Sequence, residues 1–383
     1  MAKTIIVRYG ELALKSEKVR RRFERQLIDN IELSLHGLKH RIRRERGRIF
    51  VDTSSVKVLD KLTNVPGIVS VSMASKTNAA LDEISKAAVD IAKRTLGKSQ
   101  TFAVRASRIG AHDFSSKEVN EVVGSAVLKA VHGSKVNLSH PNRTIFVEIR
   151  GSDAYVFAEK RAGVGGLPVG TQGGVVTLLS YGIDDPVATY LMMKRGCIVF
   201  PILFYNESHM DKRARNRAVA MAKRLADFYP KLELRMVPFG EILREFVDKA
   251  PSELTCVLRK RAMLRIANII AKQVKAEAIA TGESLEQQVA GQTLANLMVI
   301  DDVSELLVLR PLVGMNKVEI ERIARSIGTF SISIKSTAEC SAASPYPKTY
   351  TNLEKVLEVE SRIDIAAMIK LALAKLEVIR ARR

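Results

Sequence analysis

The spacing of hydrophobic residues predicts a first α+β domain in residues 1–75. Apolar side chains recur every four residues from Phe23 to Leu35, which is typical of one face of a helix. Short apolar runs predict strands at 4–7, 49–51 and 68–71. Between helix and second strand lies a basic run, 41–48, which we expect to be a loop.

Residues 76–165 predict a second α+β domain. Helical periodicity covers 81–96 and 117–132. Strands are expected at 102–105, 136–138, 144–149 and 155–157.

A glycine-rich stretch at 163–170 predicts a linker, after which strands and helices alternate through a third domain, 166–383. Strands are expected at 175–179, 198–204, 232–237 and 276–280, and helices at 185–195, 211–229, 254–274, 286–297 and 351–379. Such alternation predicts a parallel sheet wrapped by helices, and ligands of these sheets bind at the carboxyl ends of the strands.

Charge points to a polyanionic partner. The 383 residues contain 61 Lys and Arg against 41 Asp and Glu, a net charge of +20, and 46% are hydrophobic, which excludes a disordered basic tail. The density of positive charge is highest in residues 1–50, which contain 14 basic and 6 acidic side chains. Nucleic acid is therefore the leading candidate partner, and an anionic membrane surface is the second.

The cysteine content and the hydropathy of the sequence limit the cellular compartments in which we expect the protein. Three cysteines are too few for a disulfide-built secreted scaffold, and no Cys/His cluster has zinc spacing. Neither a signal peptide nor a membrane-spanning run is visible. We therefore expect a cytoplasmic protein without a membrane partner.

The first turn of the third domain offers candidate chemistry. Ser180-Tyr181-Gly182-Ile183-Asp184 links a predicted strand to a predicted helix, where free backbone N–H groups and the helix dipole favour an anion. The Ser180 hydroxyl adds a donor, and Asp184 could hold Mg2+. An ordinary strand–helix turn without ligand is the alternative, because no Walker-type lysine is present.

This turn resembles the Ser-Gly-Gly-x-Asp-Ser pyrophosphate loop of enzymes that adenylate a substrate with ATP. Further segments resemble one family in order along almost the whole chain, the tRNA 4-thiouridine synthetases (tRNA uridine 4-sulfurtransferases). They are Ile6–Lys15, Lys135–Leu138, Phe146–Ile149, Gly165–Gly173, Lys260-Arg261, Thr281–Leu285, Gln292–Leu294, Arg310–Met315 and Ile327–Thr329.

The resemblance implies an N-terminal ferredoxin-like domain, a THUMP RNA-binding domain and an α/β pyrophosphatase-loop domain. It implies that ATP adenylates uridine 8 of tRNA at O4 and that persulfide sulfur then replaces the adenylate to give 4-thiouridine. The sulfur would come from an external persulfide or sulfide donor, and the protein would be a homodimer. A role in sulfur transfer for thiamine thiazole synthesis is also linked to the family.

The resemblance also implies functional residues. Catalytic roles fall on Cys340, Cys256 and Asp184, with Mg2+ on Asp184. The positions implied for ATP are Leu178, Leu179, Ser180, Gly182, Asp184, Leu203, Phe204, Lys260, Gly282 and Gln292. Basic clusters predict tRNA contacts at Arg20, Arg21, Arg41, Arg43, Arg44 and Arg105.

Three residues depart from the family pattern in this site. Tyr181 replaces a loop glycine and could block the cradle, while Asp185 replaces the last loop serine and would repel phosphate unless a metal intervenes. Arg259 stands where many members have the second cysteine of Cys-x-x-Cys, and segment 286–291 is one residue longer than usual.

Two hypotheses therefore stay open, a working synthetase with an altered loop and a tRNA-binding paralogue that has lost adenylation. A generic ATP-dependent ligase acting on small molecules would explain the third domain but not the two basic domains before it.

Overall fold

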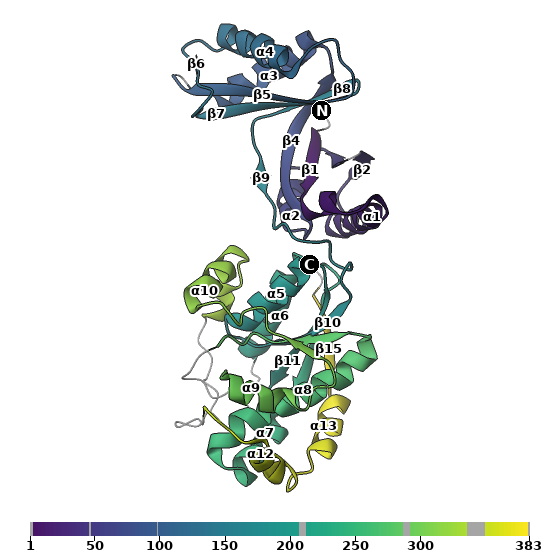
Figure 1. Cartoon of the computed structure of the whole chain (residues 1–383), viewed down its shortest axis with the longest axis vertical. Coiled ribbons are helices and arrows are strands. Elements are labelled where there is room, and N and C mark those ends of the chain that lie inside the picture. Colours follow the sequence, from purple (N-terminus) through teal and green to yellow (C-terminus); the bar gives the residue numbers. More distant parts are fainter. Residues whose placement is uncertain are drawn as a thin grey trace. The chain divides into compact units, whose positions relative to one another are not determined.

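The computed structural model describes residues 3–45, 47–97, 99–206, 212–285, 292–334 and 349–381. The chain divides into two compact units, Met1–Gly166 and Leu167–Arg383, which are described separately below (Figure 1).

Unit 1 is built on one mixed sheet with strand order β2-β3-β1-β4-β8-β7-β5-β6, and β9 also pairs with β4. Its elements are β1 (Lys3–Tyr9), η1 (Glu11–Leu14), α1 (Glu17–Ser34), β2 (His40–Glu45), β3 (Arg48–Thr53), α2 (Lys57–Thr63), β4 (Ile68–Asn78), α3 (Leu81–Thr95), β5 (Thr101–Ile109), α4 (Ser116–Ala130), β6 (Lys135–Val136), β7 (Arg143–Arg150), β8 (Asp153–Phe157) and β9 (Arg161–Ala162).

The two faces of this sheet differ in what they carry. Beside β5 and β7, α3 and α4 bury an aliphatic core that includes Ile84, Val123 and Ile145 (Figure 1). Among the described residues, the cluster on the opposite face comes from strands alone, and its aromatic members are Phe50, Phe146, Tyr155 and Phe157. We call this surface the aromatic face of unit 1.

Unit 2 contains a sheet of order β14-β13-β10-β11-β12-β15, parallel except for β15 at the edge. Its elements are β10 (Gly174–Leu179), α5 (Asp184–Lys194), β11 (Ile198–Tyr205), α6 (Lys212–Ala226), β12 (Glu233–Pro238), α7 (Gly240–Lys249), η3 (Ser252–Leu254), α8 (Thr255–Val274), β13 (Ala278–Ala280), α9 (Leu294–Asp301), β14 (Leu307–Leu309), α10 (Lys317–Ser326), α11 (Phe330–Ser333), α12 (Leu353–Glu360), α13 (Ile365–Ala374) and β15 (Glu377–Arg380).

Helices cover both faces of this sheet, as the alternating sequence pattern predicts. One side carries α5, α6, α10 and α11, whereas α7, α8, α9, α12 and α13 share the main hydrophobic core on the other. The strand order reverses between β10 and β13, and a crevice at the carboxyl ends of the strands is expected there. The predicted fold class, α+β domains followed by an α/β domain, is confirmed.

Three predicted elements are wrong in part. The basic run expected as a loop contains β2, which pairs along β3. The helix expected over 286–297 begins only at Leu294, and residues 286–291 lie outside the described part.

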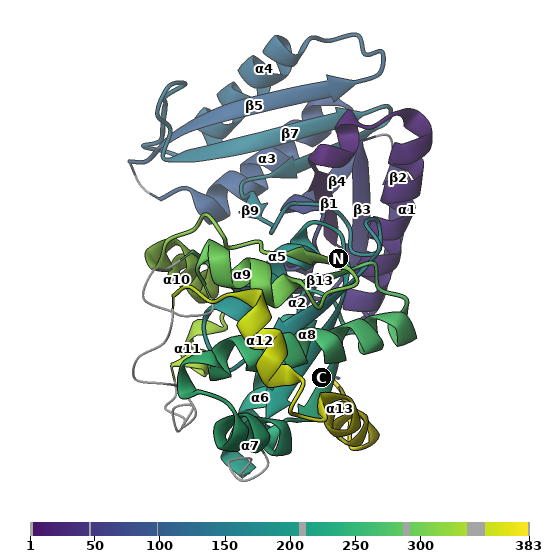
Figure 2. The same cartoon turned by 60° about the horizontal axis from the view of Figure 1, so that its bottom comes forward.

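The single helix expected over 351–379 is two helices, α12 and α13 (Figure 2), followed by the strand β15 (Figure 1). Asp364 caps the second helix, because its Oδ1 accepts a hydrogen bond from the Ala367 N–H at 3.0 Å. The last residues then pair with β12 as β15.

Candidate active site

A cavity of about 370 Å3 lies at the carboxyl ends of β10, β11 and β13 in unit 2. It is lined by Leu178, Leu179, Ser180, Gly182, Asp184, Asp185, Phe204, Arg259, Lys260, Met263, Leu264, Thr281, Gly282, Glu283, Gln292, Ile300 and Arg310. The structure thus brings together all the predicted ATP positions except Leu203, which is buried in the sheet beside Phe204.

The β10–α5 turn supplies the polar floor of this cavity. The Ser180 hydroxyl accepts a hydrogen bond from the Gly182 N–H at 3.1 Å, and the Gly182 carbonyl accepts one from the Ser333 hydroxyl at 2.9 Å. The first turn of α5 begins at Asp184, so its unpaired N–H groups and helix dipole favour an anion at this end of the cavity.

Tyr181 does not line the cavity. Its ring lies under the guanidinium group of Arg217 from α6, 4.8 Å from the ring centroid. The tyrosine that replaces a family glycine is therefore accommodated outside the nucleotide cradle, and the expected obstruction is absent at this position.

Asp185 joins the turn to the loop after β13. Its Oδ1 accepts a hydrogen bond from the Gly282 N–H at 3.0 Å, and a Cβ on Gly282 would lie only 2.2 Å from that oxygen, so glycine is required there. The pKa of Asp185 is raised to about 6, chiefly by burial; the hydrogen bond with Ser180 and the charge of Lys260 lower it, whereas the neighbouring carboxylates of Asp184 and Glu283 raise it.

A chain of alternating charges forms the opposite wall. Lys260 Nζ lies 2.6 Å from Glu283 Oε1, and Arg310 Nε donates to Glu283 Oε2 at 2.7 Å. Arg310 also binds both carboxylate oxygens of Asp301 at 2.8 and 2.6 Å. Burial alone would raise the pKa of Glu283, but Lys260 and Arg310 lower it overall, so this carboxylate stays ionised and holds both cations at the cavity.

Asp184 is paired with Lys317 at the start of α10, whose Nζ lies 2.7 and 2.9 Å from the two carboxylate oxygens. Mg2+ is commonly held in proteins by one or two carboxylates together with substrate phosphates. Among the described residues, no group of three or more His, Cys, Asp or Glu side chains is placed to hold a metal ion by protein ligands alone. Asp184 therefore fits a Mg2+ that arrives with a nucleotide.

Of the two cysteines predicted to be catalytic, Cys256 lies among the described residues and Cys340 does not. Cys256 is partly exposed in the first turn of α8 and does not line the cavity, whereas Arg259, one turn on, does. Cys340 lies outside the described residues. Cys197 is buried, as the sequence predicts for a small hydrophobic side chain.

Sequence reasoning missed Glu283, Arg310 and Lys317 as individual site residues. A signal for Glu283 was available, because it follows a predicted strand by three residues and thus stands at the carboxyl edge of the sheet. Lys317 comes from a helix distant in sequence, and only the tertiary structure places it beside Asp184.

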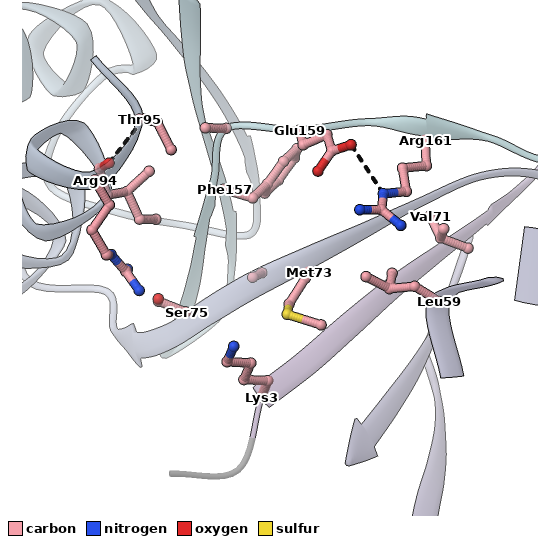
Figure 3. A pocket seen from close by; sticks show the side chains of 13 residues that line it. Lys3, Leu59, Val71, Met73, Ser75, Arg94, Thr95, Phe157, Glu159 and Arg161 are labelled. Atoms are coloured by element: carbon pink, nitrogen blue, oxygen red, sulfur yellow. Dashed lines mark hydrogen bonds and ion pairs between the residues drawn. The ribbon is translucent and has the colours of Figure 1, made fainter. Parts of the chain in front are cut away.

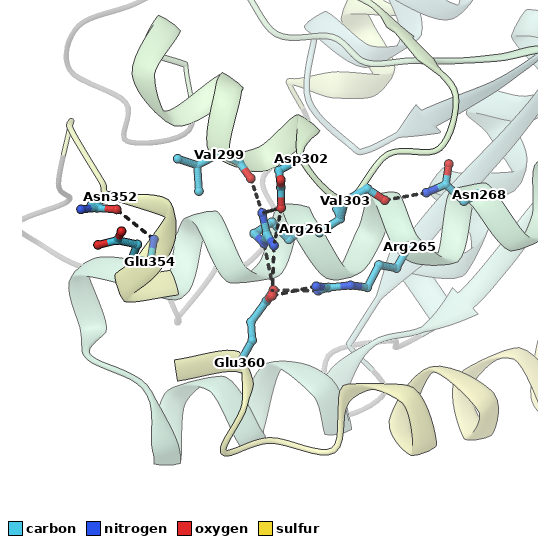
Figure 4. A network of polar contacts seen from close by, with 9 residues as sticks. All are labelled: Arg261, Arg265, Asn268, Val299, Asp302, Val303, Asn352, Glu354 and Glu360. Carbon is cyan, nitrogen blue, oxygen red and sulfur yellow. Dashed lines mark hydrogen bonds and ion pairs between the residues drawn. The ribbon is translucent and has the colours of Figure 1, made fainter. Parts of the chain in front are cut away.

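A buried ion-pair network fixes α8, the helix that carries Lys260 (Figure 4). Arg261 is fully buried and binds Glu360 from α12 and Asp302 after α9, at 2.9 and 3.1 Å. Arg265 binds the same Glu360 through two contacts of 2.7 Å. Lys260 is therefore presented by a helix that is tied to two other elements.

The predicted tRNA contacts are mostly ion-paired in unit 1. Arg20 and Arg44 approach Glu24 at 3.9 and 3.7 Å, Arg21 pairs with Glu17, and Arg43 pairs with Asp52 at 3.0 Å. Arg41 is exposed, and Arg105, also exposed, donates to the Leu138 carbonyl at 2.8 Å.

Unit 1 also has a smaller cavity of about 230 Å3, lined among others by Lys3, Met73, Ser75, Arg94 and Phe157 (Figure 3). Arg161 at its edge pairs with Glu159 at 2.9 Å. None of the predicted functional residues lines this cavity.

Comparison with known proteins agrees with this domain order. The ThiI ferredoxin-like domain matches residues 4–72, the THUMP domain matches 78–159, and the thiamine biosynthesis protein (ThiI) family matches 170–365. Probable tRNA sulfurtransferases of Methanosarcina mazei and Methanothermobacter thermautotrophicus are 38% and 40% identical to this chain. These alignments cover 98% and 94% of this chain and 95% and 94% of the relatives.

Solved structures give the same result. A 4-thiouridine synthetase, crystallised as an RNA complex with bound ATP, superposes with a TM-score of 0.90 at 32% identity and covers 99% of both chains. PH1313 from Pyrococcus horikoshii has a TM-score of 0.65 at 26% identity and covers 85% of this chain and 99% of its own.

The fold and the cavity define a transferase whose α/β catalytic domain follows a ferredoxin-like and a THUMP domain. Within that class the chain belongs to the ThiI family of tRNA sulfurtransferases. No helix among its described residues is long and apolar enough to cross a membrane.

Proposed function

We propose that this protein is an active ATP-dependent tRNA sulfurtransferase that converts uridine 8 of tRNA to 4-thiouridine. The observation that carries the proposal is the cavity at the β10–α5 turn, which keeps the backbone donors, Ser180 and Lys260 while the Tyr181 ring lies elsewhere. The similar 4-thiouridine synthetase complexed with RNA and ATP supports the same use of this cavity.

In the first step, O4 of the uridine attacks the α-phosphate of ATP, pyrophosphate leaves, and the proton on N3 of the base is lost to solvent. Backbone N–H groups of the β10–α5 turn and the Lys260 ammonium would stabilise the negative charge that develops on the phosphates. Mg2+ held by Asp184 would neutralise the leaving pyrophosphate, and Lys317 would then exchange its carboxylate partner for phosphate oxygens.

In the second step, a sulfur nucleophile attacks C4 of the adenylated base, and AMP leaves. We propose that Cys340 carries the persulfide and that Cys256 supplies the second thiol. When the terminal sulfur has bonded to C4, the thiolate of Cys256 attacks the sulfur of Cys340, which breaks the S–S bond, releases the thiocarbonyl product and leaves a disulfide. With hydrosulfide as donor, no thiol is oxidised.

Further features belong to the same proposal. An external persulfide or sulfide donor supplies the sulfur, the protein acts as a homodimer in the cytoplasm where its tRNA substrate is found, and the same sulfur serves thiamine thiazole synthesis. The family name supports the last of these.

Thiolation of an unmodified tRNA transcript, with ATP, Mg2+ and sulfide, tests the proposal. We expect AMP, pyrophosphate and 4-thiouridine in equal amounts, and a loss of at least tenfold in rate for Lys260→Met. Lys249→Met, which removes an exposed lysine of α7 paired with Glu245, is the matched control. Absence of AMP formation with both Mg2+ and Mn2+, while tRNA still binds, would favour the impaired paralogue instead.

A further inference from the structure

Two consecutive carbonyl groups of the β10–α5 turn are bound by residues from other elements of unit 2. Arg217 from α6 donates from Nη2 to the carbonyl oxygens of Tyr181 and Ser333, each at 3.5 Å. Its guanidinium group also lies over the Tyr181 ring. The Ser333 hydroxyl donates to the next carbonyl of the turn, that of Gly182, at 2.9 Å. We call Tyr181, Arg217 and Ser333 the loop clamp.

The helices that supply the loop clamp are themselves packed. Arg217 lies in the second turn of α6 and is only 9% exposed. Ser333 ends α11, which packs against α6 and α10 (Figure 2). The short α11 is anchored at its start by Thr329, which is fully buried and donates its N–H to the Ala324 carbonyl of α10 at 3.0 Å. The loop clamp therefore connects the β10–α5 turn to two packed helices.

The loop clamp sets the direction of two amide groups in the turn. The carbonyl and the N–H of a trans peptide point in opposite directions, and the described peptides are all trans. The carbonyls of Tyr181 and Gly182 are bound by the clamp. The N–H groups of the same two peptides, which belong to Gly182 and Ile183, therefore point away from it. The Gly182 N–H bonds to the hydroxyl of Ser180, a residue that lines the cavity.

Tyrosine occupies the position of the family glycine without backbone strain. Among the described residues other than glycine, a positive φ occurs only at Ser99 and Lys275, so Tyr181 has an ordinary backbone conformation. Glycine would leave the empty turn freer to change its conformation, whereas the tyrosine ring gives the turn a contact with α6. The tyrosine therefore favours one conformation of the turn.

The loop clamp lies outside the cavity that it borders. Neither Tyr181 nor Arg217 lines the cavity, whereas Ser180, Gly182 and Asp184 do. The clamp residues can therefore influence a bound nucleotide only through the turn that they hold.

We propose that Tyr181 and Arg217 are positioning residues that hold the β10–α5 turn in its ATP-binding conformation before ATP arrives. This inference rests on the proposed function, in which ATP binds at that turn. A turn that is ordered in advance does not have to be ordered by the ligand, so less of the binding free energy is lost. Since the triphosphate is charged before it reacts, the oriented donors favour the ground state and the transition state alike. The clamp therefore acts on KM for ATP and not on kcat.

Steady-state thiolation of a tRNA transcript with sulfide, at varied ATP concentration, tests the inference in the full-length protein. We expect Tyr181→Gly and Arg217→Met each to raise KM for ATP about five- to tenfold, while kcat and KM for tRNA change by less than about twofold. Tyr181→Phe should restore the wild-type KM, because the phenyl ring keeps the contact with the guanidinium group. The double variant should lie within about twofold of the weaker single variant, because both residues act through one contact.

Arg235→Met is the matched control. Arg235 of β12 also lies over an aromatic ring, 5.4 Å from the Phe200 centroid, but its neighbour on β11 is Ile202 in the middle of the strand, and it does not line the cavity. This variant should keep the wild-type KM for ATP even where its Tm falls.

Other outcomes overturn the inference. An unchanged KM for ATP in Tyr181→Gly and Arg217→Met, with a lowered Tm, would show that the loop clamp only stabilises the fold. A loss confined to kcat would place Arg217 on the reacting phosphates instead.

Failure of the proposed function can be told apart from failure of the inference. If the wild type forms no AMP, the proposed function fails, and isothermal titration with ATP and Mg2+ then tests the loop clamp by itself. A weaker ATP affinity of Tyr181→Gly than of the wild type would support the clamp, and equal affinities would overturn it. A wild-type protein that does not bind ATP at all would overturn both.

Discussion

At the scale of single residues, the protonation state of the Asp185 carboxyl group affects the stability of the folded protein. Asp185 replaces a hydroxyl-bearing residue of the family loop, and its carboxylate is used for a bond to the Gly282 backbone. Its pKa of about 6, against 3.8 for an ordinary aspartate, means that the folded protein binds this proton more tightly than the unfolded chain. The stabilisation by the neutral form is complete below pH 4 and is lost as the pH rises through 6.

Asp185→Asn should therefore stabilise the protein increasingly between pH 4 and pH 7, by up to about 3 kcal/mol relative to the wild type. Asparagine keeps an oxygen that can accept the hydrogen bond from Gly282. Urea unfolding of both proteins at several pH values measures the difference. A difference that does not change with pH would show that the carboxyl group titrates normally.

Asp185→Asn should also change how the affinity for ATP depends on pH. An ionised Asp185 beside the phosphate cradle repels a polyphosphate, so ATP affinity of the wild type should fall relative to that of Asp185→Asn as the pH rises through 6. Isothermal titration of both proteins with ATP and Mg2+ at pH 5.5 and 8 measures this ratio, in which the titration of ATP itself cancels. An equal pH dependence in the two proteins would contradict the prediction.

At the scale of elements, the position of α8 depends on buried charge. The Arg261 side chain is fully buried, and its partner Glu360 has a pKa that burial would raise but that Arg265 and Arg261 lower overall. Removing one partner of a buried pair leaves the other charge without compensation, which costs more than the loss of an exposed pair.

Glu360→Gln should lower the free energy of unfolding by about 3 kcal/mol at pH 7, with a smaller loss in acid, where the wild-type carboxylate becomes protonated. The exposed pair Glu358 and Arg362 on the same helix and the turn after it provides the control, and Glu358→Gln should cost less than about 1 kcal/mol. Equal losses from chemical denaturation of the two variants would show that the buried network contributes no more than a surface pair.

At the scale of the whole molecule, ATP chemistry and the proposed RNA contacts fall in different compact units. The cavity with Lys260 belongs to Leu167–Arg383, and the basic clusters belong to Met1–Gly166. A change confined to one unit should therefore affect one activity.

We expect Lys260→Met to bind tRNA with wild-type affinity and salt dependence while its rate of pyrophosphate release falls at least tenfold. Conversely, neutralising Arg41, Arg43 and Arg44 together should flatten the salt dependence of tRNA binding and leave tRNA-independent ATP binding unchanged. Filter binding with labelled tRNA and equilibrium dialysis with ATP measure the two properties. Loss of both properties in either variant would contradict this separation.

The local pattern of the sequence determined most helices and strands, the order of the domains and the cradle at Ser180–Asp184, because helical and strand periodicity and turn residues act over a few positions. It could not show that β15 pairs with β12, since the same apolar residues fit the helix expected over 351–379. It could not show where the Tyr181 ring goes, because that depends on Arg217 of another helix. The pairing of Lys317 with Asp184 was likewise decided by tertiary structure, because charges far apart in sequence meet only when helices pack.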